Sequence, residues 1–133
     1  MRAVLLMLVG ATAGWASGCV SPTGPNTITP ASSGVFSGTV YPDGRTQWPF
    51  ELTATGTVRV TLTSVDPSSL VLGVGIGEFS GHRCELASQA ETKASNAPQL
   101  TSLVDAGEKC VAVFDVGGVP SSGASFSLTI QGP

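Results

Sequence analysis

Three short runs in which apolar and polar residues alternate constrain the fold of this 133-residue chain more than any other feature. Thr57–Thr63 reads TVRVTLT, so every second side chain is apolar. Gln47–Thr53 and Ala124–Ile130 repeat this pattern. Because successive side chains point to opposite faces of a β-strand, each run predicts a strand with one buried and one exposed face. The chain is therefore expected to bury its core between β-sheets.

Five further segments have less regular strand patterns, and turn residues separate them. Pro49 cannot donate a ladder hydrogen bond, so its strand is expected at a sheet edge or with a local bulge. Ala87–Ala94 is expected to form a loop with at most one helical turn. The candidate strands are Val35–Tyr41, Leu70–Ile76, His82–Leu86, Leu100–Val104 and Cys110–Phe114, of which the last is apolar on both faces and is expected centrally.

About eight short strands in one chain of this length predict a single all-β domain, an antiparallel β-sandwich. The composition agrees, because glycine is abundant and charged residues make up only 11% of the chain, about half the usual share. The net charge is −3, and no cluster of basic residues occurs. Nucleic acid is therefore not expected as a partner.

The first 18 residues have the features of a bacterial lipoprotein signal peptide. The largely apolar segment Ala3–Trp15 is shorter than the roughly 20 residues that span a bilayer. Ala16-Ser17-Gly18-Cys19 resembles the lipobox, although Leu is more usual at the position of Ala16. We expect removal of Met1–Gly18 and attachment to the lipid bilayer through acylated Cys19. The alternative is an ordinary secretory signal that leaves Cys19 as a thiol.

A tether is expected between the lipidated cysteine and the folded domain. Val20–Ser33 contains no charged residue and three prolines, which favour extended backbone. The β-sandwich is then expected over Gly34–Pro133. In enteric-type bacteria, Asp directly after the lipidated cysteine is associated with retention in the inner membrane. The residue after Cys19 is Val20, which favours an extracytoplasmic position on the outer membrane.

Once Cys19 is assigned to the anchor, Cys84 and Cys110 remain as an even pair. In an oxidising compartment such a pair is expected to form a disulfide. The alternative is a redox-active or metal-binding pair. The absence of a CxxC spacing and the presence of a single histidine argue against it.

No segment of the sequence has a specific catalytic pattern. His82 is the only histidine, so a Ser–His–Asp hydrolase would have to use it, but no G-x-S-x-G motif occurs. Gly73–Gly77 lacks the Lys-Ser/Thr of a phosphate-binding loop and is better explained as a strand of small, closely packed residues. Solubility explains the carboxylates at predicted strand ends and turns, which are Glu78, Glu85, Asp105, Glu108 and Asp115. We expect no enzyme, no catalytic residue and no cofactor.

The end of the chain carries a recognisable pattern. Ala106–Gly117 reads AGEKCVAVFDVG and is followed by Phe126–Ile130. This resembles the closing hairpin of bacterial pre-peptidase C-terminal domains, in which G-x-Y-x-V-x-V precedes a turn and a strand like Y-x-L-x-V. The segment from Trp48 to Gly77 is similar to the first half of that family. The resemblance spans Gly34–Pro133 and implies a jelly-roll-like β-sandwich.

Two departures limit what the resemblance implies about binding. In that family these domains are appended to secreted proteases, and some bind calcium or fibrous substrates. The family's acidic D-x-D-L stretch appears as Asp66-Pro67-Ser68-Ser69-Leu70, which has one carboxylate, and Lys109 replaces the aromatic residue after the glycine. Because the calcium ligands do not map onto this sequence, no metal is expected.

Tyr41 and Trp48 are the candidate ligand surface, because exposed aromatic rings stack on sugars. Trp48 alternates in phase with Phe50 and Leu52, which favours a place in the core. The leading hypothesis is a membrane-anchored, non-catalytic module for adhesion or interaction that binds polysaccharide or an envelope protein. The alternatives are a purely structural envelope lipoprotein and a small hydrolase using His82. A concave face with Tyr41 or Trp48 would favour binding, and flat faces covered with Ser and Thr would favour the structural role.

Overall fold

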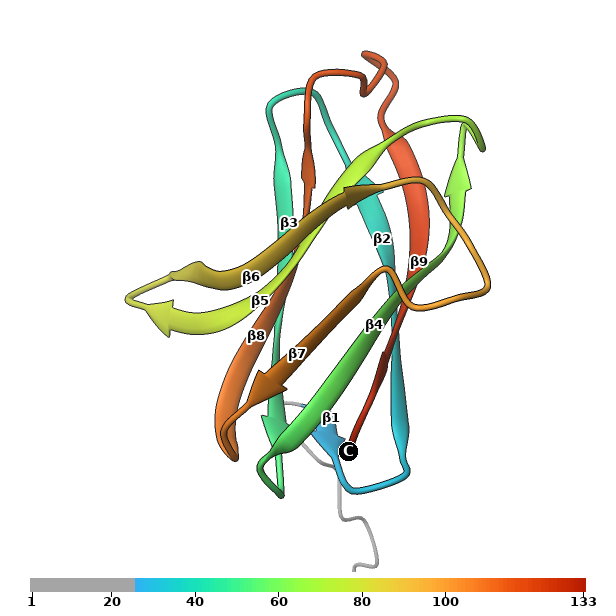
Figure 1. Ribbon diagram of the computed structural model, residues 1–133. Coiled ribbons are helices and arrows are strands. Elements are labelled where there is room, and N and C mark those ends of the chain that lie inside the picture. Colours follow the sequence, from blue (N-terminus) through green and yellow to red (C-terminus); the bar gives the residue numbers. More distant parts are fainter. Residues whose placement is uncertain (1–25) are drawn as a thin grey trace, which may run out of the picture.

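The computed structural model describes residues 26–133, which form nine β-strands (Figure 1). The predicted signal peptide and Cys19 lie outside the described residues. Within residues 26–133 there is no helix long and apolar enough to cross a membrane. The strands are β1 (Asn26–Ile28), β2 (Ser33–Val40), β3 (Arg45–Leu52), β4 (Gly56–Asp66), β5 (Leu72–Ser80), β6 (Arg83–Thr92), β7 (Leu100–Val104), β8 (Gly107–Asp115) and β9 (Ala124–Gln131).

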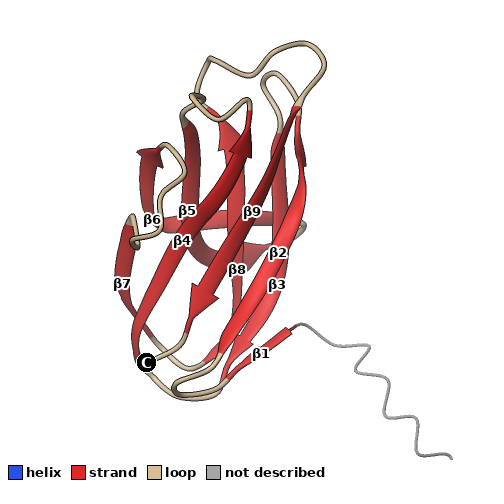
Figure 2. Cartoon of the chain, turned by 90° about the vertical axis from the view of Figure 1, so that its right-hand side faces the viewer, coloured by secondary structure: helices blue, strands red, loops and turns tan. Residues whose placement is uncertain are grey.

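The strands form two sheets that pack face to face (Figure 2). One sheet has the order β1-β3-β8-β5-β6 and the other has the order β2-β9-β4-β7. All pairings are antiparallel except that of β1 with β3. Alternate side chains of both sheets fill the core, among them Phe50, Val60, Val74, Val113 and Leu128, which are all fully buried. The predicted β-sandwich is confirmed.

The sandwich begins earlier in the chain than the sequence predicted. Asn26–Ile28 pairs in parallel with Phe50–Leu52 of β3, and the side chain of Ile28 is buried. The part of the predicted tether from Asn26 onward therefore belongs to the folded domain, and the boundary at Gly34 is wrong. The prediction rested on prolines and missing charge, but Thr27-Ile28-Thr29 has the alternation of a short strand.

All eight predicted strands are present, and β8 lies at the centre of its sheet between β3 and β5. Pro49 lies beside an open edge, since β1 pairs with β3 only from Phe50 onward. Two details differ from expectation. The segment expected as a loop after Leu86 continues β6 as far as Thr92. β8 and β9 are not a hairpin, because they lie in different sheets and the chain crosses the sandwich between them.

The β5–β6 hairpin bends across the outer face of its own sheet, as its projecting tip in Figure 1 shows. A register shift between Ile76 and Gly77 marks the bend.

Cys84 on β6 is joined to Cys110 on β8 by the predicted disulfide, which is confirmed. Gln47 on β3 holds the same strand, because its Oε1 accepts the Cys84 N–H at 3.0 Å. Closing a loop of 26 residues contributes about 3.5 kcal/mol in the chain-entropy model.

Glycines on the outer face of β5 allow this close approach. A Cβ at Gly73 would lie 2.2 Å from the ring of Phe114, and one at Gly75 would lie 2.5 Å from Leu86. At Gly77 the obstacle is backbone, with the Glu85 carbonyl oxygen 1.6 Å away. The interpretation of the GVGIG run as a strand of closely packed small residues is confirmed.

Candidate functional site

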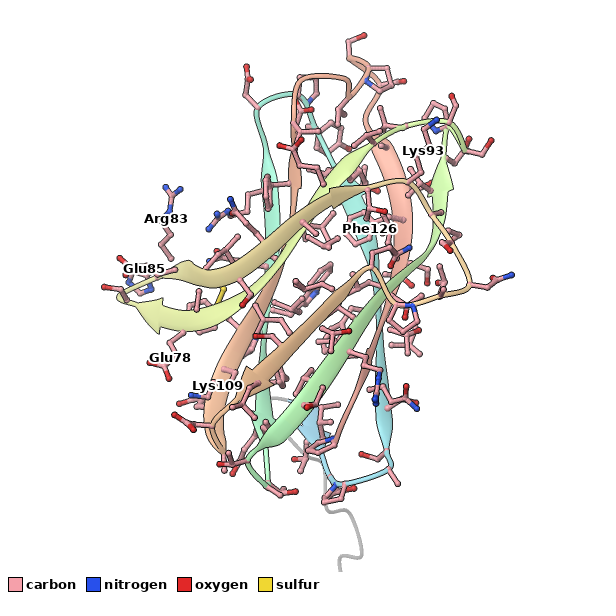
Figure 3. The ribbon with its side chains drawn as sticks, viewed as in Figure 1. Glu78, Arg83, Glu85, Lys93, Lys109 and Phe126 are labelled. Carbon is pink, nitrogen blue, oxygen red and sulfur yellow. A yellow bond between two sulfur atoms is a disulfide. The ribbon has the colours of Figure 1, made fainter. Side chains whose placement is uncertain are left out.

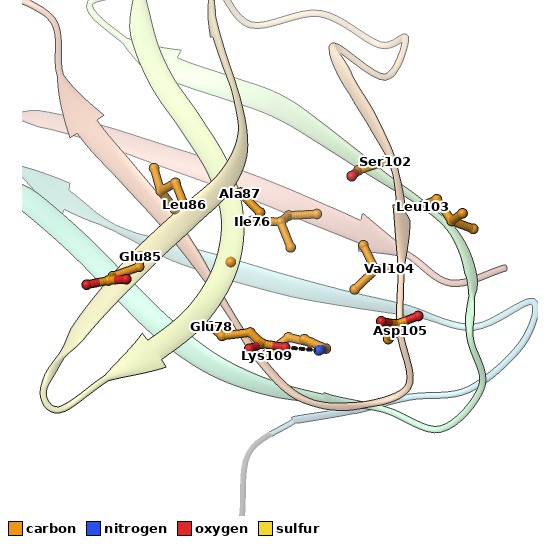
Figure 4. Close-up of a pocket in the computed structure, with 11 residues that line it drawn as sticks. Ile76, Glu78, Glu85, Leu86, Ala87, Ser102, Leu103, Val104, Asp105 and Lys109 are labelled. Carbon is orange, nitrogen blue, oxygen red and sulfur yellow. Dashed lines mark hydrogen bonds and ion pairs between the residues drawn. The ribbon is translucent and has the colours of Figure 1, made fainter.

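A pocket of about 380 Å³ opens where the bent hairpin moves away from the second sheet (Figure 4). Its apolar wall comes from Ile76 on β5 and Val104 on β7. Leu86 on β6 also lines the pocket, but its side chain packs against the cluster around the disulfide. The pocket therefore lies between the edge strands of the two sheets, β6 and β7. A hydrogen bond of 2.9 Å between the hydroxyls of Ser88 and Ser102 joins these two strands beside it.

Lys109 is the buried cation of this pocket. It shares a strand face with Val111 and Val113, so its side chain points between the sheets, and only 9% of that side chain is exposed. Its ammonium donates to a carboxylate oxygen of Glu78, which lies on β5 across the pocket (Figure 4). The Glu78 side chain is 69% exposed, so the pair joins a buried cation to a solvated anion. Among residues 26–133 no other charged side chain is buried.

Acidic groups outnumber this cation around the pocket. Glu78 and Glu85 are directly opposite each other in the β5–β6 register, a like-charge arrangement that is unfavourable without a counterion. Asp105, just after β7, also lines the pocket and lies on the side toward which the Lys109 side chain extends (Figure 4). Around Lys109 the pocket thus has two carboxylates, Glu78 and Asp105, for one ammonium, while the Glu85 side chain points away from them (Figure 4).

The structure does not bring the two predicted aromatic residues together. Trp48 is half-buried and packs between Phe36 and Phe126, with ring centroids 5.4 and 5.6 Å away. Trp48 thus packs against the core, as its alternation predicted, and its assignment to a ligand surface stays a prediction. Tyr41 is 58% exposed but lies at the β2–β3 turn, where its ring covers Gly123.

His82 is exposed in the turn at the tip of the β5–β6 hairpin, beside Gly81 with φ of 64°. Its backbone carbonyl accepts a hydrogen bond from the Gln47 side chain. In the described part of the chain, no hydrogen bond joins its ring to a serine or a carboxylate. The arrangement that a hydrolase would need at His82 is not formed by these residues.

Arg83 lies near this tip, with Glu85 and Glu78 close by (Figure 3), and Arg45 contacts the same hairpin from β3. Arg45 reaches across from β3 and donates to the Cys84 carbonyl at 2.6 Å, with its guanidinium 5.7 Å from the centre of the Phe114 ring. Burial, followed by the charge of Arg83, lowers the pKa of Arg45 from its ordinary value. Arg45 stays protonated at neutral pH, because an arginine begins from a pKa far above this range.

Of the predicted strand-end carboxylates, Asp115 has a structural role. Its Oδ1 accepts the backbone N–H groups of Gly117, Gly118 and Val119, and its Oδ2 accepts that of Asp43 at 2.8 Å. The β2–β3 turn and the β8–β9 loop are thereby tied together. These hydrogen bonds, the one from Asp43 first, hold the pKa of Asp115 below its ordinary value.

Sequence reasoning missed the pocket and the role of Lys109. Lys109 entered only as a departure from a family pattern, and Glu78 and Asp105 only as soluble strand ends. One signal was present: Lys109 occupies an inward-facing position in phase with Val111 and Val113. A charged residue at such a position requires a partner. Within residues 26–133 no group of three His, Cys, Asp or Glu side chains is placed to hold a metal ion.

Comparison with known proteins gives likeness of fold without likeness of sequence. The chain matches no protein-family model, and no curated protein matches its sequence. The fold is similar to the pre-peptidase C-terminal domain of collagenase from Bacillus anthracis, with a TM-score of 0.50 and 9% identity over 80% of this chain and 91% of that one. It is also similar to PliG from Aeromonas hydrophila, a periplasmic inhibitor of g-type lysozyme, with a TM-score of 0.53 and 14% identity over 80% and 96% of the two chains.

These identities establish a shared fold only. The fold expected from the resemblance to pre-peptidase C-terminal domains is confirmed by the first of these structures. The disulfide between Cys84 and Cys110 is typical of proteins that fold in oxidising, extracytoplasmic compartments.

Proposed function

We propose that this chain is a lipid-anchored, extracytoplasmic, non-catalytic interaction module whose partner is a protein of the cell envelope. The observation that carries the proposal is the pocket between β6 and β7. Its wall is partly apolar and partly charged, and a disulfide-linked hairpin forms one side of it. A pocket of about 380 Å³ is at the small end of ligand sites and fits one protein side chain.

A protein partner is favoured over a polysaccharide by the positions of the aromatic residues. Trp48 is in the core, and Tyr41 stands on a turn apart from it, so the two do not form a stacking platform. One structure with a similar fold is an inhibitor of an enzyme, which is a protein-binding function. The same scaffold therefore supports binding of proteins.

The lipid anchor rests on the lipobox-like sequence that ends at Cys19 and on the disulfide of the domain. It is tested by expressing the full chain in a bacterium that processes lipoproteins, beside the variant Cys19→Ser. The proposal expects the chain in the membrane fraction, with an intact mass that begins at Cys19 and includes acyl chains. The variant is expected to be unacylated. An unacylated chain of unaltered Cys19 sequence, starting elsewhere, would refute the anchor.

The partner class is tested with envelope fractions of the same bacterium. The purified Cys19→Ser chain is added to these fractions before and after protease treatment, and to fractions treated instead with polysaccharide hydrolases. We expect bound protein to fall after protease treatment and to be unchanged after hydrolase treatment. The reverse pattern would establish a polysaccharide ligand in place of a protein.

A second function is favoured by the outer face of the four-stranded sheet. Hydroxyl side chains occupy much of this face, beside the exposed Val35 and Leu103. The hydroxyl side chains are those of Ser37, Thr61, Thr63, Ser127 and Thr129, and the Ser37 and Ser127 hydroxyls are 2.8 Å apart. Such a face suits a purely structural envelope lipoprotein that spaces other components. Membrane attachment without saturable binding to any envelope fraction would support this function over the first.

A further inference from the structure

We propose that the pocket between β6 and β7 binds the side chain of an arginine or lysine on the partner protein. The proposal rests on the proposed function for the existence of a protein partner, and it adds the chemistry by which that partner is recognised. The residues that carry it are Ile76 and Val104 for the apolar wall and Glu78, Asp105 and Lys109 for the charges.

The apolar wall suits the aliphatic part of a long basic side chain. Ile76 and Val104 are buried at the base of the pocket, whereas the Leu86 side chain packs against the cluster around the Cys84–Cys110 disulfide. Arginine and lysine bury their methylene groups against apolar surface while their charged ends remain near water or a carboxylate. A short polar side chain would leave this wall uncovered.

The charges around the pocket select a cation. The ammonium of Lys109 is already neutralised by Glu78, so it offers little attraction to an anionic ligand. Asp105 has no ion-pair partner among residues 26–133 and lies on the side toward which the Lys109 side chain extends, whereas the Glu85 side chain points away from both (Figure 4). An entering anion would face the charge of Asp105, whereas a guanidinium or ammonium would be attracted by it.

The probe pair that tests this idea differs in charge and is matched in shape. N-acetyl-arginine amide and N-acetyl-citrulline amide are titrated into the isotope-labelled Cys19→Ser chain, and amide chemical shifts are followed by NMR. We expect the arginine compound to shift the amides of Gly77, Leu86, Val104 and Lys109 and to bind about fivefold tighter than citrulline at low salt. Higher salt should reduce this difference because the groups at the mouth are exposed.

Two substitutions locate the binding. Asp105→Asn removes the carboxylate with no ion-pair partner and is expected to weaken arginine binding up to about fivefold. Asp66→Asn is the matched control, since this exposed carboxylate is at the end of β4 and does not line the pocket. The proposal requires that the control variant bind arginine as the parent chain does.

Four results would overturn the assignment. The first is that the citrulline compound shifts the same amides as much as the arginine compound does. The second and third are that N-acetyl-glutamate amide, or glucosamine, binds more tightly than the arginine compound. The fourth is that Asp105→Asn leaves the affinity for the arginine compound unchanged. The glucosamine result would point to an amino-sugar ligand. None of these titrations involves a membrane. Any of these four results would therefore reject a basic side chain as the ligand without contradicting the proposal of a lipid-anchored module. An unacylated chain in the fractionation experiment would remove the anchor and leave the pocket assignment standing.

Discussion

At the scale of single residues, the ion pair of Lys109 and Glu78 combines a buried cation with an exposed anion. Glu78→Gln is expected to lower the free energy of unfolding by about 1–3 kcal/mol, because the buried ammonium loses its counterion. Glu85→Gln is the control, since it removes the cross-strand like charge without touching Lys109, and it should change stability by less than about 0.5 kcal/mol. Urea unfolding at pH 7 measures the change in the free energy of unfolding for each variant. Equal changes in the two variants would contradict this account of the ion pair.

Asp115 gives a prediction for pH dependence. Its pKa is depressed in the folded chain, so its contribution to stability is complete above the unfolded value of 3.8 and is lost as the pH falls through the folded pKa. Asp115→Asn removes one acceptor oxygen and should lower Tm at pH 6, with the difference from the parent shrinking below about pH 3.8. Circular dichroism melts across this range test it, with Asp66→Asn as the control. A difference that stays constant down to pH 2 would contradict the assignment.

At the scale of elements, the glycines of β5 determine whether the β5–β6 hairpin can bend over its sheet. Gly77→Ala is expected to cost about 3 kcal/mol, because the new methyl group would meet the Glu85 backbone. Gly73→Ala should cost less, because the obstacle there is the ring of Phe114, which can move. Denaturant unfolding of the two variants gives the order. The reverse order would show that the bend does not depend on backbone contact at Gly77.

The same hairpin shows where reasoning from sequence ends. Alternation predicted β3, β4 and β9, because each has one face in the core and one in solvent. The second half of β6 was missed, since Ala, Gln, Glu and Lys favour helices in isolation and only pairing with β5 keeps this segment extended. The sheet to which β9 belongs was missed for a similar reason, because residues 116–123 do not specify whether the chain turns back or crosses the sandwich.

The pocket could not be predicted because it depends on that bend. Glu78, Asp105 and Lys109 are far apart in sequence, and they share one site only because β5 leaves its regular register after Ile76. The disulfide, in contrast, followed from counting cysteines. Local pattern thus determined the strands, and long-range packing determined the site.

At the scale of the whole molecule, β1 changes how the domain relates to a lipid anchor. Six residues separate Cys19 from Asn26. Whatever their conformation, covalent geometry limits their reach to roughly 25 Å. A tether that continued to Ser33 would have reached roughly 40 Å or more. If Cys19 is acylated as proposed, the sandwich lies closer to the membrane, and its partner must be found near the bilayer surface.

The parallel strand is also part of the fold's stability, and Ile28 tests this. Its side chain is 1% exposed, its Cδ1 lies against Gly34, and its carbonyl accepts the Thr53 N–H at 3.0 Å. Ile28→Ala leaves a cavity at this end of the sandwich and is expected to lower the free energy of unfolding by about 3 kcal/mol. Val35→Ala, on the exposed face of β2, should change it by less than about 0.5 kcal/mol. Equal, small effects in urea unfolding would mean that β1 adds nothing to the core and that the folded domain begins where the sequence first placed it, at Gly34.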